Sequence, residues 1–423
     1  MVATKETWLS RLLPSNRSRK RRTRDMKRPL RFEPLEDRRL LSISVTGTVI
    51  LDASGDVPIR NATVTGTLTR GGATIAKVTA ATTDQGQFTL DFDNASGTLG
   101  PLQAGDVISC DVKAASPQTA PAGAGPRQAA YSVWETKLGT QGSSTAGSAT
   151  MGETFKHTVT AAEATQGLSD DLGTIPIYGD GLPSGDTRIV DADTLTADVS
   201  NGFEIFTILD TYYTFAGNTG LGMHNNASAL RVYYSFLSPE TNSWYRHSAG
   251  DGLPAIVITA ANLALDAKVV GHEYGHFCAD QDGFLNKQQG LGAQHTLDEN
   301  QRLMAKPSAT PLLTTADALL AFNEGYADWF AVSGAVHGAT AGLSGLPGFN
   351  EGGQTTFDGY DLAAGDNSVG RGEDEELSTA AILWALESDP ICTSNPNITG
   401  YFSVNRKVEG ISGAHRGPPP WPL

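Results

Sequence analysis

The sequence predicts an α+β protein in which an N-terminal antiparallel β-sandwich precedes a mostly helical domain with a small sheet. Apolar residues alternate with polar ones in short segments after residue 43, which is the period of a strand. Beyond residue 195 they recur three or four apart, as on an amphipathic helix. The 423 residues suffice for two folded units plus tails.

Residues 1–42 form a basic segment that we interpret as a targeting signal. The first 39 residues carry a net charge of +8 and the remainder −23, so the acidic body would repel nucleic-acid phosphates. We therefore expect no nucleic-acid partner. The alternative interpretation is a solvated, disordered tail.

The end of this head carries a short motif, Leu35-Glu36-Asp37-Arg38-Arg39-Leu40-Leu41. It resembles the N-terminal Leu-Glu-x-Arg-x-Leu-Leu element of exported or surface proteins of planctomycete-type bacteria, with Asp37 where that element usually has Pro. The resemblance implies a secreted or cell-surface protein. No stretch approaches the roughly 20 apolar residues of a transmembrane helix, and three cysteines allow one disulfide at most.

Residues 43–179 are predicted to form the sandwich. The alternation of apolar and polar residues starts at Ile43. Further short apolar segments follow, each bounded by Gly, Asp or Asn residues typical of turns. The segments 58–64 and 83–88 resemble prealbumin-like modules of secreted enzymes and adhesins. A Pro-, Ala-, Gly- and Ser-rich stretch, 114–148, is interpreted as a flexible loop or linker. Asp171–Ile177 reads as the last strand, and the domain boundary is placed near Asp180.

Residues 180–423 are predicted to form the helical domain. Apolar residues from Leu195 to Tyr213 indicate a helix that ends before Gly217. The segments 230–234 and 255–259 read as strands, and a second helix is expected over about 261–279.

That second helix carries His272-Glu273-Tyr274-Gly275-His276. Two histidines four residues apart project from one helix face and can bind one zinc ion, while Glu273 is placed to act as a general base on a water molecule. The alternative is a helix whose histidines are merely hydrogen-bonded.

A further helix, expected to start near Thr315, supplies a candidate third ligand. Glu324 and Asp328 are four apart and share a face. Glu324 could complete the metal shell while Asp328 accepts the other ring N–H of His272. A solvated acidic face is the alternative, but the surrounding Leu, Phe, Tyr and Trp residues are too apolar for it.

Together, His-Glu-Tyr-Gly-His and Asn-Glu-Gly-Tyr-Ala-Asp resemble the gluzincins, specifically the thermolysin-like and fungalysin-like zinc metallopeptidases, over about residues 200–390. The resemblance implies a zincin-type endopeptidase acting on protein or peptide substrates. It implies zinc ligands His272, His276 and Glu324, general base Glu273 and supporting Asp328.

A later block, 370–386, resembles another helix of this family, with Ala381, Leu383, Trp384 and Leu386 expected to pack beneath the site. Calcium is a second cofactor that some relatives hold. The acidic loop that could bind it contains Asp358, Asp361, Asp366 and Glu373, although a solvated acidic loop fits its spacing better.

The chain departs from the family in the group that would stabilise the oxyanion. Thermolysin-like enzymes place a Tyr between the second His and the third ligand, but no Tyr occurs over 277–323. Tyr326, His295 and His415 are the remaining candidates, and the C-terminal region is short. A truncated enzyme, or a surface binding or adhesion protein with a degenerate metallopeptidase-like domain, is therefore the rival hypothesis to a peptidase.

Overall fold

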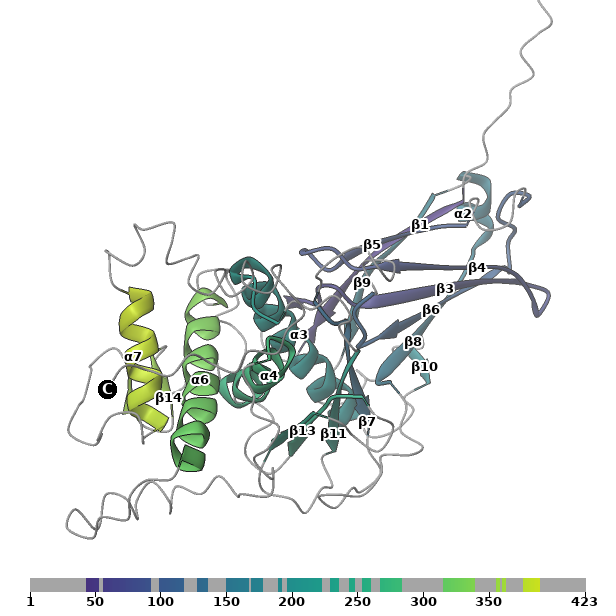
Figure 1. Cartoon of the computed structure of the whole chain (residues 1–423). Helices are drawn as coiled ribbons and strands as arrows, with labels where there is room; N and C mark the ends of the chain where they lie inside the picture. Colours follow the sequence, from purple (N-terminus) through teal and green to yellow (C-terminus); the bar gives the residue numbers. More distant parts are fainter. Residues whose placement is uncertain are drawn as a thin grey trace, which may run out of the picture. The chain divides into compact units, whose positions relative to one another are not determined.

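The computed structural model describes parts of the chain between residues 43 and 388 (Figure 1). The described ranges are 43–52, 56–92, 99–117, 128–135, 150–166, 169–177, 189–191, 196–222, 229–235, 243–247, 253–259, 267–283, 315–338, 355–357, 360–362 and 376–388. These residues contain both helices and sheets, as expected for the α+β class. None of the described helices is long and apolar enough to cross a membrane.

Two sheets make up most of the N-terminal part. The first is four-stranded and contains β2 (Val57–Pro58), β1 (Ser44–Leu51), β5 (Gln87–Asp91) and β9 (Ser169–Ile177). The second is five-stranded, in the order β10 (Ile189–Asp191), β8 (Gly152–Thr158), β6 (Val107–Lys113), β3 (Thr63–Arg70) and β4 (Ala73–Ala81). A short helix, α2 (Ala161–Gln166), precedes β9.

The two sheets face each other across a core built by alternating residues. Every second residue of β1 and β6 is buried, which is the pattern expected for a sheet with one covered face. A Cβ at Gly66 of β3 would lie 2.5 Å from Leu90 Cδ1, so glycine permits the side chains of β5 to reach the opposite sheet.

The prediction of an antiparallel sandwich is wrong for one strand. β9 pairs with β1 in parallel, with Thr48 opposite Thr174 and Leu51 opposite Ile177. Alternation of apolar and polar residues predicts that a segment is a strand. It does not show whether that strand pairs in parallel or antiparallel with a strand far away in the sequence.

A third sheet has the order β12 (Trp244–Arg246), β13 (Ala255–Thr259), β11 (Leu230–Ser235) and β7 (Tyr131–Glu135). The predicted linker, 114–148, therefore contains the strand β7. This strand was not predicted because the residues on both sides of it are rich in Gly and Pro. Strand pairing also crosses the predicted boundary near Asp180 in both directions, because β7 pairs with β11 and β10 pairs with β8.

In the described portion of the second part, the third sheet is accompanied by the long helices α3 (Thr196–Thr219), α4 (Ala267–Gln281) and α6 (Thr315–Gly338). They pack against one another, and α7 (Glu376–Ser388) packs on α6 (Figure 1). The helix predicted from Leu195 is confirmed, but it continues through Gly217, where it was expected to have ended, to Thr219. The motif helix is confirmed from Ala267 to Gln281, and its predicted start near residue 261 lies outside the described residues. A two-stranded ribbon, β14 (Thr356–Phe357) and β15 (Tyr360–Asp361), lies before α7 in the chain.

The packing predicted for α7 is only partly correct. Ala381, Leu383 and Trp384 are partly buried against the core, but Leu386 is 48% exposed. The polar residue Glu387 instead fixes this helix to α6, where it accepts hydrogen bonds from Trp329 Nε1 at 2.9 Å and Ser333 Oγ at 2.6 Å.

Candidate metal centre

Helix α4 is buried along almost its whole length, which requires small residues where other elements approach it. Gly271 lies against the ring of Tyr212 from α3. A Cβ at Gly275 would be 3.0 Å from Ala327 Cα and 3.2 Å from Phe330 Cβ, both on α6. The two glycines therefore let α3 and α6 come close to the helix that carries His272 and His276.

Helix α6 presents Glu324 and Asp328 toward α4, while Tyr326, Trp329 and Phe330 of the same helix are buried in the core. Phe330 stacks with Tyr212 at a ring-centroid distance of 5.9 Å, and Tyr212 Oη donates to the carbonyl of Ala331 at 2.9 Å. These contacts fix how far α6 can rotate, so the direction of its two carboxylates is set by packing.

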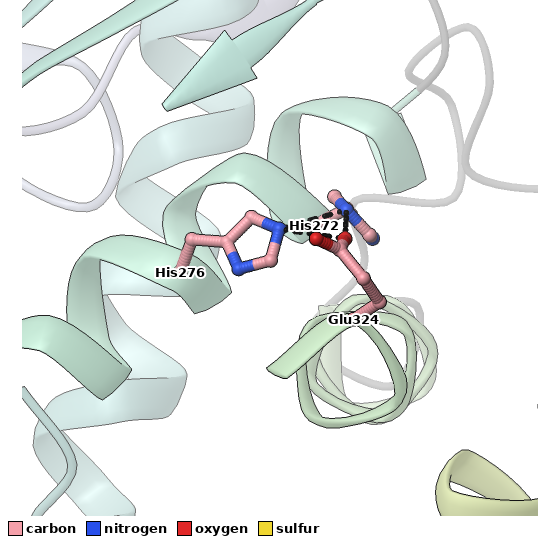
Figure 2. Close-up of side chains that lie close together, drawn as sticks. All are labelled: His272, His276 and Glu324. Carbon is pink, nitrogen blue, oxygen red and sulfur yellow. Dashed lines mark hydrogen bonds and ion pairs between the residues drawn. The ribbon is translucent and has the colours of Figure 1, made fainter. Parts of the chain in front are cut away.

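Three side chains from the two helices converge on one point (Figure 2). The Nε2 atoms of His272 and His276 are 3.1 Å apart, and Glu324 Oε2 lies 3.2 Å from the first and 3.0 Å from the second. Within the described residues, this is a group that could hold a metal ion, with its donor atoms all within 4.8 Å of one another.

The donor spacing fits a small cation. Ligand atoms about 2.0–2.1 Å from a tetrahedral zinc ion lie about 3.3 Å from each other, and the three observed separations are 3.0 to 3.2 Å. Two ring nitrogens and a carboxylate oxygen this close need a proton or a metal ion between them, since their lone pairs repel one another.

Asp328 contacts His272 at the ring nitrogen that is not part of the donor group. Its Oδ1 accepts a hydrogen bond from Nδ1–H of His272 at 2.7 Å, and the Asp328 side chain is fully buried. Donation by Nδ1 leaves Nε2 as the nitrogen that faces His276 and Glu324 and that a metal ion can bind in place of a proton. The predicted contact between these residues is thus present.

The pKa shifts show that the site favours positive charge. Burial alone would lower the pKa of His272, but the carboxylates of Asp328 and Glu324 raise it well above its ordinary value. Burial would raise the pKa of Glu324, yet the two histidines bring it well below its ordinary value. The carboxylates thus make the donor group attractive to a cation.

The remaining predicted residues have different outcomes. Glu273 is buried on α4 directly after the first histidine, with 6% of its surface exposed. Tyr326 is two positions from Glu324 and so lies about 200° around α6. Its ring packs 5.4 Å from Trp329 inside the core, which does not fit the predicted oxyanion role. His295 and His415 lie outside the described residues.

The acidic loop considered for calcium is also mostly outside the described residues. Of its four predicted members, Asp361 ends β15, whereas Asp358, Asp366 and Glu373 fall in undescribed segments. Calcium binding stays a prediction.

A polar cluster beside the ligand helix was missed by the reasoning from sequence. Asp280, four residues beyond His276 on the same face of α4, accepts hydrogen bonds at Oδ2 from Tyr245 Oη at 2.7 Å and from Nδ1 of His247 at 2.5 Å. The spacing of four residues shows that Asp280 lies on the same helix face as His276. Nothing in the sequence, however, indicates that Asp280 contacts the residues of β12. The cluster anchors the edge strand of the third sheet to the helix that holds the two histidines.

Comparisons with known proteins do not assign a family. No protein-family model and no curated protein sequence matches the chain. A match among solved structures is a 9R-lipoxygenase from Cyanothece PCC8801, with 10% sequence identity and a TM-score of 0.20. The match covers 43% of this chain, which spans 24% of that protein's length.

Proposed function

We propose that the protein is a zinc-dependent endopeptidase, with His272, His276 and Glu324 as metal ligands. The convergence of their three donor atoms from α4 and α6 supports this proposal most directly. Two His and one Glu are a set typical of catalytic zinc, which has three protein ligands and one open position, whereas structural zinc sites close with four ligands rich in Cys. Cys110 and Cys278 are buried outside this group.

Each residue has a distinct task in the proposed reaction. A bound zinc ion would supply Lewis acidity to activate a water molecule and polarise the scissile carbonyl. Glu273 takes the proton of the attacking water and later gives it to the leaving amine. Asp328 holds His272 in the tautomer that offers Nε2, and the buried surroundings of both helices exclude bulk water.

The substrate class and the location follow from the same proposal. Protein or peptide substrates fit the resemblance of the two helical motifs to gluzincins, and export to the cell surface or medium fits the basic N-terminal element.

The test is casein hydrolysis by the full chain, with bound zinc quantified in the same sample. Glu273→Gln should abolish hydrolysis while zinc binding is kept, because the amide cannot accept the proton. A strong chelator should abolish both. Glu163→Gln, which changes a half-buried helix-capping carboxylate in the N-terminal part, is the matched control and should leave hydrolysis unchanged.

The outcomes separate the proposal from its rival. One equivalent of zinc without hydrolysis of any peptide would indicate a binding or adhesion protein with a degenerate site. A chain that binds no zinc would remove the ligand assignment as well. Hydrolysis that persists in Glu273→Gln would refute the role of Glu273.

A further inference from the structure

Strand β7 joins the N-terminal sheets to the sheet of the second part. On one edge, the N–H of Val133 donates to the carbonyl of Ala114 at 2.8 Å, and the N–H of Met151 donates to the carbonyl of Val133 at 2.9 Å. On the other edge, β7 pairs in parallel with β11, with Val133 opposite Val232. The same strand thus completes hydrogen bonding on both sides.

A buried ion pair makes a second connection between the two parts. Arg60, in the turn before β3, places an Nη2 atom 3.2 Å from Asp210 Oδ2 and 3.2 Å from Thr211 Oγ1, both on α3. Asp210 also accepts a hydrogen bond from Tyr131 Oη of β7 at 2.8 Å. The side chains of Arg60 and Asp210 are only 14% and 7% exposed.

Apolar contacts also connect the N-terminal part to α3. The ring of Tyr131 lies 5.2 Å from that of Phe206 and 5.1 Å from that of Tyr213, both on α3. Helix α3 in turn packs on α4 and α6, which carry the metal-binding group. The N-terminal part therefore supports a helix on which the site rests.

We infer that the N-terminal sandwich is a permanent structural part of the metal-binding half of the chain, and not a removable prosegment, a detachable inhibitor or a tethered spacer. If the module were normally removed, its departure should leave few unpaired hydrogen-bonding groups and little exposed apolar surface on the remaining domain. Here its loss would expose the hydrogen-bonding edge of β11 and the apolar surface of α3 around Phe206, which is fully buried and packs on Tyr131. The inference depends on neither zinc nor peptidase activity.

A cut chain tests the inference without removing any residue. A specific protease site is inserted between Ile177 and Ile189 of the full chain, and the purified protein is cleaved there. The two fragments should remain together on size-exclusion chromatography and unfold in a single transition. Separation of the fragments in native buffer, or two independent unfolding transitions, would overturn the inference. Neither readout requires hydrolytic activity, so a failure here is distinguishable from failure of the proposed function.

A pair of matched variants tests the ion pair in the cut protein. Arg60→Ala removes the cation that faces Asp210 across the two parts. Arg70→Ala is the control, because Arg70 pairs with the buried Asp106 inside the N-terminal part at 2.7 Å. When the cut protein is diluted in native buffer, Arg60→Ala should raise the concentration at which the fragments separate at least tenfold, and Arg70→Ala should not. Equal effects of the two substitutions would contradict the proposed interface.

Discussion

The Nδ1–H of His272 on α4 donates a hydrogen bond of 2.7 Å to Asp328 Oδ1 on α6. The bond ties the first proposed ligand to the helix that supplies the third, so the orientation of one imidazole and the distance between two helices are set together.

Asp328→Asn should therefore weaken zinc binding while the fold is kept. The amide retains the size of the buried side chain but no longer favours donation by Nδ1, and loss of such support typically costs about 10–100-fold in metal affinity. Competition with a chromophoric chelator measures the affinity, and circular dichroism checks the fold. Unchanged affinity in a folded variant would show that Asp328 does not support a ligand.

Gly275→Ala tests the close approach of the same two helices. The added methyl group would meet the Ala327 backbone at 3.0 Å, so α6 must move outward. Overpacking of this kind costs about 1–3 kcal/mol, and better helix propensity offsets up to about 1 kcal/mol of it. We expect lower stability and weaker zinc binding, since Glu324 moves with α6.

Gly100→Ala is the control for this substitution. A Cβ added at Gly100 would have no other atom within 4 Å, so neither stability nor zinc affinity should change. Denaturant titration gives the free energy of unfolding for each variant. If Gly275→Ala binds zinc as tightly as the unchanged protein, the helix spacing does not control the donor group.

The sequence predicted the parts of this structure that depend on local periodicity. Spacings of four placed His272 with His276 and Glu324 with Asp328, because residues one helical turn apart share a face. The same rule could have removed Tyr326 from the candidates, since an offset of two from Glu324 points it elsewhere.

Features that depend on distant partners were not predictable in this way. The strand that starts at Tyr131 is only five residues long and lies in a Gly- and Pro-rich stretch. Its parallel pairing with β11 could therefore not be predicted from its own sequence. Likewise, Arg60 and Asp210 are far apart in the chain, and neither charge reveals that it will be buried against the other.

Glu204 should make stability decrease as the pH rises from mildly acidic to mildly alkaline. It is 2% exposed, and among the described residues its Oε1 has no hydrogen-bond partner. Burial raises its pKa from 4.5 to about 8. Above pH 4.5 the unfolded chain releases this proton while the folded chain retains it, so the unfolded state is increasingly favoured until about pH 8.

Glu204→Gln removes this titration, so it should stabilise the protein relative to the unchanged chain by an amount that increases as the pH rises above 4.5. Chemical denaturation at intervals from about pH 4 to 9 gives the difference between the variants. The difference should grow from pH 4.5 to about 8 and then stay constant. A difference that does not vary with pH would mean that Glu204 is not protonated in the folded protein.

The contact between His337 of α6 and Glu387 of α7 should produce a stability optimum in mildly acidic solution. Nε2 of His337 lies 3.3 Å from Glu387 Oε1, and this hydrogen bond raises the pKa of His337 above 6.5. Burial would raise the pKa of Glu387, but His337, Ser333 and Trp329 together lower it below 4.5. The imidazole ring also stacks on Phe215 at a centroid distance of 5.2 Å.

The signs of the two shifts define the pH window. A raised histidine pKa contributes stability that is complete below 6.5 and is lost as the pH rises through the folded-state value. A lowered carboxyl pKa contributes stability that is complete above 4.5 and is lost as the pH falls through the folded-state value. Both contributions are therefore complete between pH 4.5 and 6.5.

Denaturant unfolding of the unchanged protein and of His337→Phe should differ most inside that window. Phenylalanine keeps a ring against Phe215 but offers Glu387 no proton, so the stacking is retained and the charge interaction is removed. Above the folded-state pKa of His337 the difference should shrink toward the small, constant value left by the neutral hydrogen bond. A difference that increases on going from about pH 6 to pH 9 would show that the interaction does not depend on a protonated imidazole. The hydrogen bonds from Ser333 and Trp329 would then be the ones that hold Glu387.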